Sequence, residues 1–367
     1  MSAADERRHP TGRQVVVGLL VGVVLLGSGH VAAPEGVRKG PCAGANPAAQ
    51  AAAKALDRCR WSDAERLLQP LIASQPDCGS VVLALARLRA ARGEVAEAER
   101  LFSRATSIAP DDAVAHAHFA QYWLSRGQPA RADYEAALAL SLDPRCTEAL
   151  VARGRLLSGR GRLQEAREAL ETAVSLDPEN AEAHYRLGIL SFRGKRPDLS
   201  TAYFEKVTAV RPVDALAFDY LALSREALGD AEGAERAWRR ALDVNEPPFF
   251  DPLLDLNYGR FLRNEGRLEE SQSHLDRAAK LLTAHRGVHY ERAKLELARK
   301  DYEAARRDGE RALSTPDPAG LVLELQVYYL LAAIYGRLGE TELARKYAEL
   351  ARTTPIPDQA QDRTERP

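Results

Sequence analysis

The feature that most constrains this sequence is a column of prolines at a fixed spacing. Each proline lies 34 residues after the one before it, and the column is Pro76, Pro110, Pro144, Pro178 and Pro212. Two more columns keep the same step. One is Gly93, Gly127, Gly161, Lys195 and Gly229, and the other is Ala98, Ala132, Ala166, Ser200 and Ala234. A fixed period of this length is typical of a solenoid of stacked helix pairs.

The unit from 147 to 180 shows how one period builds two helices. Its apolar residues form two faces at helical spacing, first Leu150, Gly154 and Leu157 and then Leu163, Ala166, Leu170 and Ala173. Between the faces lies Gly161, where the chain needs a positive φ to leave the first helix. Gly154 and Ala166 are small, so the two helices can approach closely. Pro178 ends the second helix because proline cannot continue it.

Candidate units of this kind cover residues 45–354, so the sequence predicts an all-α superhelical solenoid of about nine antiparallel helix pairs. The units are roughly 45–78, 79–112, 113–146, 147–180, 181–214, 215–248, 252–285, 286–319 and 325–358. The register slips at two proline-containing segments, 247–252 and 316–320. One pair cannot bury its apolar stripe alone, so neighbouring units must stack.

The order of large, small and turn residues resembles the tetratricopeptide repeat. The residues that carry the resemblance are Tyr258, Gly259 and Leu262 in the seventh unit, Leu221, Ala222, Ala234, Trp238 and Ala241 in the sixth, and Leu331, Ala332, Tyr335 and Ala344 in the last. Arg153 departs from the pattern, because a leucine is usual there. The resemblance implies a right-handed superhelix whose first helices line a concave groove that binds peptides or protein segments. HEAT-type repeats are the alternative, but their period is usually about 40–47 residues.

The phase of the repeat places a set of side chains on this groove. The candidate partner-binding residues are Arg87, Arg155, Tyr185, Phe192, Arg193, Arg260, Arg263, Asn264, Tyr290, Lys294, Tyr329 and Arg337, and Gln121 and Asp219 are also expected to face the groove. Arginine and tyrosine dominate binding hot spots, so the groove suits an extended ligand with carboxylates. The exposed aromatic residues in this set favour a binding surface. The alternative is that these are ordinary solvated residues.

Part of this set resembles the carboxylate clamp that some members of the family use on C-terminal peptides. Arg260 and Asn264 lie one helical turn apart, as half of such a clamp does. Ala298 stands where a second asparagine is expected, so we do not predict binding of that kind of peptide.

The histidines and the overall charge do not indicate an enzyme or a nucleic-acid binder. The formal net charge is −1, whereas a nucleic-acid binder normally carries a basic face. His116 and His184 occupy the same phase two repeats apart, which indicates a structural position. No phosphate-binding loop, nucleophile elbow or zinc-protease motif occurs in the sequence. We therefore expect no catalytic, cofactor or metal site; an enzyme that uses the histidines is the less favoured alternative.

The amino-terminal residues have the pattern of an export signal. Residues 1–13 are polar and contain three arginines, and an unbroken apolar run follows within 14–33. This pattern predicts either a cleaved signal peptide or an uncleaved membrane anchor. In both cases the remainder is exported to the cell envelope, periplasmic or extracytoplasmic, and membrane contact occurs only through 14–33 if it is uncleaved. Residues 34–44 read as a linker and 355–367 as a disordered tail.

The four cysteines can be placed by the repeat geometry. Cys42 and Cys78 lie at one end of the first unit, Cys59 lies at the other end, and Cys146 lies two repeats beyond Cys78. If a disulfide forms, we expect it between Cys42 and Cys78, which export would permit. Four free thiols are the alternative.

These observations favour a non-enzymatic scaffold that binds a protein or peptide in its groove. The alternative is an accessory or regulatory subunit of an envelope enzyme or assembly complex. Such a subunit would dock through the 247–252 insertion, where exposed Phe249 and Phe250 would be unusual in a plain turn. Packing of these two rings under the next repeat is the competing interpretation of the insertion.

Overall fold

The computed structural model describes residues 46–246, 250–317 and 320–355, which lie in one compact unit. Within these residues the secondary structure is helical, without strands. The helices are α1 (Pro47–Asp57), α2 (Trp61–Ser74), α3 (Gly79–Ala91), α4 (Val95–Ile108), α5 (Ala113–Ser125), α6 (Pro129–Leu142), α7 (Thr147–Gly159), α8 (Leu163–Leu176), α9 (Ala181–Arg193), α10 (Pro197–Val210), α11 (Ala215–Ala227), α12 (Ala231–Asp243), α13 (Leu254–Asn264), α14 (Leu268–Leu281), α15 (Arg286–Ala298), α16 (Tyr302–Ser314), α17 (Glu324–Leu338) and α18 (Thr341–Thr353).

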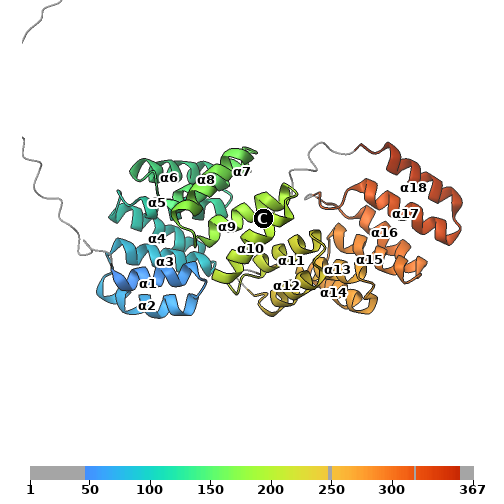
Figure 1. Ribbon diagram of the computed structural model, residues 1–367, viewed down its shortest axis with the longest axis horizontal. Helices are drawn as coiled ribbons and strands as arrows, with labels where there is room; N and C mark the ends of the chain where they lie inside the picture. Colours follow the sequence, from blue (N-terminus) through green and yellow to red (C-terminus); the bar gives the residue numbers. More distant parts are fainter. Residues whose placement is uncertain (1–45, 247–249, 318–319, 356–367) are drawn as a thin grey trace, which may run out of the picture. The chain divides into compact units, whose positions relative to one another are not determined.

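These helices pack as nine successive pairs, from α1 with α2 to α17 with α18 (Figure 1). The second helix of each pair also contacts the first helix of the next, and neighbouring first helices touch in several places. The predicted all-α solenoid of about nine antiparallel pairs is therefore confirmed. Both register slips fall between pairs, one between α12 and α13 and the other between α16 and α17.

The turn inside each pair has the left-handed backbone that the sequence predicts. Gly161 has φ +74°, and the other glycines of its column are also positive. Three pairs place a side chain there instead: Cys59, Lys195 and Lys300 have φ values of 58°, 54° and 66°. In the fifth pair the turn uses Lys195 itself, since Gly194 keeps a negative φ.

Close approach of the two helices in a pair depends on small residues, as the unit at 147–180 indicates. A Cβ added at Gly154 would lie 2.6 Å from Leu170 Cγ and 3.3 Å from the main-chain oxygen of Ala166. The same holds at Gly188, where an added Cβ would lie 2.8 Å from a ring carbon of Phe204. Glycine at these positions therefore sets the spacing of α7 and α8 and of α9 and α10.

The two histidines that share a phase have the same structural role. His116 Nε2 donates to the main-chain oxygen of Pro110 at 3.1 Å, and His184 Nε2 donates to that of Pro178 at 2.9 Å. Each imidazole therefore joins a first helix to the proline that ends the preceding unit, and the prediction of a structural position is confirmed.

Asp219 is buried, and the expectation that it faces the groove is wrong. Its carboxylate accepts hydrogen bonds from Trp238 Nε1 and from Asn257 Nδ2, both at 2.8 Å. These bonds join α11, α12 and α13, so the residue belongs to the core between two pairs.

Cys78 is disulfide-bonded, whereas Cys59 and Cys146 are buried free thiols. The alternative of four free thiols is therefore wrong. Cys42, the expected partner of Cys78, lies outside the described residues, as do the expected signal or anchor at 14–33, the linker at 34–44 and residues 356–367 of the expected tail. No helix within the described part of the chain is both long enough and apolar enough to cross a membrane.

Candidate functional site

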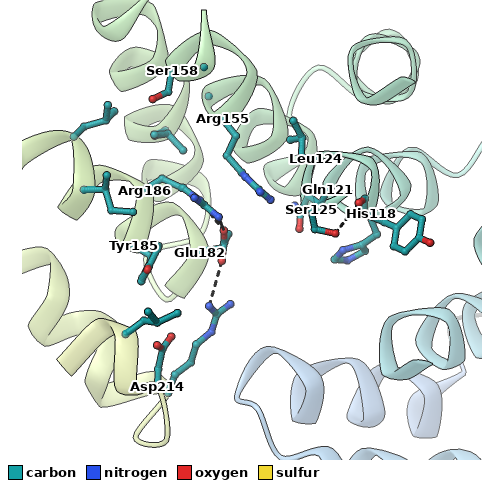
Figure 2. A pocket seen from close by; sticks show the side chains of 18 of the residues that line it. His118, Gln121, Leu124, Ser125, Arg155, Ser158, Glu182, Tyr185, Arg186 and Asp214 are labelled. Carbon is teal, nitrogen blue, oxygen red and sulfur yellow. Dashed lines mark hydrogen bonds and ion pairs between the residues drawn. The ribbon is translucent and has the colours of Figure 1, made fainter. Parts of the chain in front are cut away.

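A cavity of about 750 Å³ is lined by residues of the second to the sixth helix pairs. Four first helices, α5, α7, α9 and α11, supply most of its wall, and Figure 2 shows the side chains. The lining combines charged and polar groups with apolar ones; the main contributors are His118, Gln121, Tyr122, Leu124, Ser125, Arg155, Ser158, Gly159, Glu182, Tyr185, Arg186, Ile189, Arg211, Asp214, Leu216 and Tyr220. Such a mixture suits a ligand with both apolar and charged groups.

Glu182 is the centre of the charged part of the cavity. Its carboxylate accepts from Arg186 at 2.8 Å and from Arg211 at 3.2 Å. Burial alone would raise the pKa of Glu182, but the charges of Arg186, Arg211 and Arg155 overcome this and lower it below its ordinary value. Figure 2 shows Arg155 extending from α7 toward the centre of the cavity, with His118 and Gln121 on the opposite side from Glu182.

Burial shifts the pKa of two other lining residues toward the neutral form. Burial raises the pKa of Asp214 to about 6, although its carboxylate accepts from the Ala217 amide as the N-cap of α11. Burial, followed by the nearby charge of Arg87, lowers the pKa of His118 well below its ordinary value. The cavity therefore offers a neutral imidazole on one side and guanidinium groups on the other.

A second cavity of about 340 Å³ adjoins the first and extends to the first helix pair. Both cavities are lined by His118, Gln121, Glu182 and Arg211. Lys54, Asp57 and Arg58 of the first pair complete the wall of the second cavity. The inner surface thus carries side chains from every pair between the first and the sixth.

Contacts between the first pair and the fifth bring distant parts of the chain together. Arg211 Nε donates to the main-chain oxygen of Asp57 at 3.1 Å, and Arg58 lies 3.7 Å from the carboxylate of Glu179. The Asp57 carboxylate in turn pairs with Arg87 on α3. These contacts join residues up to 154 positions apart in the sequence, far beyond the repeat period.

The structure brings together four of the side chains that the phase of the repeat placed on the groove. Arg155 and Tyr185 line the larger cavity, Arg87 lines the smaller one, and Gln121 lines both. Tyr185 is half-buried, because its ring meets Phe204 at 5.6 Å and Tyr220 at 6.2 Å between centroids. The expectation that Tyr185 is exposed is therefore wrong.

The remaining candidates lie outside both cavities. Phe192 is half-buried against the core, Arg193 is half-buried, and Tyr290 packs among apolar side chains of the last pairs with Lys294 5.0 Å from its ring. The expected exposure of Phe192 and Tyr290 is also wrong. Their role in binding, like that of Asn264, Tyr329 and Arg337 on the surface, stays a prediction.

Arg260 and Arg263 form ion pairs within the scaffold. Arg260 makes a two-bonded pair with Glu226, and Arg263 Nη2 lies 2.8 Å from Glu291. Each pair joins the first helices of neighbouring pairs, so both guanidinium groups already have a counter-ion.

Sequence reasoning missed His118, Glu182, Arg186, Arg211 and Asp214 as lining residues. The sequence held a signal for two of them. His118 and Arg186 occupy the same repeat position as Tyr220, and these large side chains stand where other repeats have the small residues Ala84 and Ala152. Arg211 and Asp214 lie beside the α10–α11 turn, so the first-helix phase does not reach them.

The insertion at 247–252 is described only in part, because residues 247–249, including Phe249, lie outside the described residues. The Phe250 side chain is 40% exposed. Asn245 stabilises the turn, since its side chain accepts from the Asp251 amide at 2.7 Å and donates to the Asp251 oxygen at 3.2 Å. Among the described residues no group of three or more His, Cys, Asp or Glu side chains is arranged to hold a metal.

Comparison with protein families identifies the class of this chain. Models of the tetratricopeptide repeat match residues 46–122, 124–170, 151–215 and 325–351, which together are more than half of the sequence. The chain therefore belongs to the tetratricopeptide repeat family. A search of curated proteins found no match.

Solved structures with the same fold include two larger helical repeat proteins. A chain of the APC/C hetero-tetramer Cut9–Hcn1 is 15% identical with a TM-score of 0.60; the match covers 82% of this chain and 58% of that one. The human IFIT1 dimer with PPP-AAAA is 18% identical with a TM-score of 0.51, covering 80% of this chain and 68% of that one. This chain thus spans little more than half of the Cut9–Hcn1 match, and both likenesses show the fold alone.

Proposed function

We propose that this chain is a non-enzymatic scaffold that binds an extended segment of a partner protein in the larger cavity. The observation that carries the proposal is the mixed lining of consecutive first helices, where Arg155 and Arg186 lie beside Tyr185 and Tyr220. Guanidinium groups bind carboxylates, and aromatic rings bury apolar side chains. A segment with acidic and apolar residues therefore fits this surface.

The scaffold reduces the cost of binding because its groups are already held in place. Arg186 is fixed by Glu182, and Tyr185 is fixed by Phe204 and Tyr220. Ordering a side chain on binding costs on the order of 1 kcal/mol, so a pre-ordered wall leaves most of the ordering cost to the partner.

A pull-down from native cells with the full chain tests this proposal. Arg155→Ala removes a cavity guanidinium, whereas Arg153→Ala makes the same change two residues away on the exposed face of α7. We expect Arg155→Ala to reduce recovery of one specific partner at least about tenfold, since a charge-assisted contact is worth roughly that factor. Arg153→Ala should retain the partner. Equal recovery with both variants, each equally helical by circular dichroism, contradicts cavity binding and directs attention to the 247–252 insertion.

The proposal also includes export to the cell envelope, which rests on the sequence of residues 1–33. The arginines followed by an apolar run support it. Fractionation of cells together with amino-terminal sequencing of the mature chain tests it. A chain found in the cytoplasm with its original amino terminus would rule out export by this segment; an envelope-bound chain would distinguish an anchor from a cleaved signal.

A further inference from the structure

We propose that the turn inside the first helix pair, which lines the smaller cavity, acts as a clasp that opens to admit the partner segment and closes on it. The clasp is residues 57–60, the end of α1 and its turn into α2. This inference deepens the proposed function and rests on it, because the clasp matters for binding only if the cavities hold the partner.

Direct contacts hold the clasp against the fifth pair. The guanidinium of Arg211 donates to the main-chain oxygen of Asp57 at 3.1 Å while it also binds Glu182 at 3.2 Å. Arg58 and Glu179 add an exposed ion pair at 3.7 Å. Arg211 therefore couples the closed clasp to the carboxylate at the centre of the charged cavity.

The strength of these contacts is suited to opening in solution. The exposed Arg58–Glu179 pair contributes little, because solvent and salt screen it. Arg211 adds one hydrogen bond, from its Nε to the main-chain oxygen of Asp57. By contrast, the clasp remains tied to its own neighbour, since the Asp57 carboxylate pairs with Arg87 on α3. The clasp can therefore separate from the fifth pair while it stays attached to the second.

Cys59 lies at the closed contact and reports on its opening. Its side chain is only 6% exposed, and it directly follows Asp57 and Arg58, which both contact the fifth pair. Cys146 is a matched internal reference: it is also a buried free thiol, it lies at the start of α7 among Ala113, Ala117 and Ala149, and burial raises the pKa of both thiols to about 12.

The test measures thiol labelling of the full chain, without reductant, by peptide mass at both cysteines. Arg211→Gln removes the bond to Asp57, and Arg186→Gln is the matched control because Arg186 binds the same carboxylate, Glu182, from within α9. We expect Arg211→Gln to raise labelling at Cys59 about tenfold, the factor that a hydrogen bond from a charged donor provides. Arg186→Gln should leave labelling at Cys59 unchanged, and neither variant should change Cys146.

A second variant tests the clasp independently, in case Arg211→Gln does not fold. Glu179→Arg, at an exposed position, places a like charge opposite Arg58, so we expect a smaller rise at Cys59 and none at Cys146. Unchanged labelling at Cys59 in both clasp variants would overturn the proposal. So would a parallel rise at Cys59 and Cys146, because it would indicate general unfolding. The measurement uses no partner, so its result is independent of whether the cavity-binding proposal succeeds.

Discussion

At the scale of single residues, the turn inside each pair has a left-handed backbone, which glycine adopts with less strain than other residues. Most pairs have glycine at the left-handed position, whereas Lys195 and Lys300 adopt positive φ with a side chain. The left-handed region strains an L-residue with a Cβ, and glycine avoids this strain at a smaller cost in chain entropy.

Lys195→Gly and Lys300→Gly should therefore stabilise the fold, each by about 0.5–1 kcal/mol. The measurement is the midpoint of chemical denaturation followed by circular dichroism. Lys280→Gly is the control, because this lysine is exposed within α14 and glycine there should cost about 1 kcal/mol. Loss of stability at all three sites would show that the turn is not strained.

Packing at Gly154 gives a second residue-scale prediction. Since an added Cβ would lie 2.6 Å from Leu170 Cγ, Gly154→Ala should destabilise the chain by about 1–3 kcal/mol through overpacking. Gly159→Ala in the same helix should be neutral or stabilising, because an added Cβ there meets nothing within 4 Å. Thermal unfolding of both variants checks this, and equal effects would contradict the close approach of α7 and α8.

Asp214 gives a prediction about pH. Its folded pKa of about 6 lies above the ordinary 3.8, so the folded state holds a proton that the unfolded state has lost. Stability from this group is present below pH 4 and is lost as the pH rises to 6, by at most about 3 kcal/mol. Asp214→Asn should remove this loss and be more stable than wild type at pH 7. Denaturation curves from pH 4 to 7 test it.

Asp214 is also the N-cap of α11, so the effect of changing an N-cap aspartate to asparagine needs a separate control. Asp230→Asn makes the same change at an exposed N-cap, where the carboxylate accepts from the Gly233 amide at 2.9 Å. If Asp214→Asn follows the wild-type dependence on pH from 4 to 6, the raised pKa is wrong.

At the scale of helices, polar contacts join pairs whose apolar stripes are already packed. The Asp219 carboxylate holds Trp238 on α12 and Asn257 on α13, across the boundary where the repeat register slips. Helix packing alone does not fix the orientation of two elements, whereas a buried acceptor with two donors does.

Asp219→Ala should destabilise the chain by about 1–3 kcal/mol, because it leaves the Trp238 indole without its buried acceptor. Asp219→Asn keeps an acceptor oxygen and should cost less. The denaturation midpoint followed by tryptophan fluorescence measures both variants. If Asp219→Ala leaves the midpoint unchanged, or if it removes partner binding with the midpoint intact, the residue acts at the groove and not in the core.

At the scale of the whole molecule, the sequence predicts what repeats and misses what does not. The proline and glycine columns predicted the helix pairs because each pair is a local structure that depends on its own 34 residues and its neighbours. Arg155 and Gln121, which the phase predicted to face the groove, line the larger cavity. It could not predict the contact of Arg211 with Asp57, because that contact depends on how the curvature of several pairs accumulates.

The same limit explains why Asp219 and Tyr185 were assigned to an exposed face. These two residues share a phase with Ala117, which packs against the following pair, so side chains there are covered by the neighbouring unit. Tyr329 has that phase in the last pair and is 53% exposed.

The most direct test of cavity binding is photo-crosslinking in native cells with a photo-reactive residue placed at 159 or at 134. Gly159 lines the larger cavity and has space around it, whereas Tyr134 is 69% exposed on α6 and is not among the lining residues. We predict that one partner crosslinks from 159, that Arg155→Glu abolishes this crosslink, and that the partner does not crosslink from 134. A partner captured from 134 and never from 159 would contradict binding in the cavity.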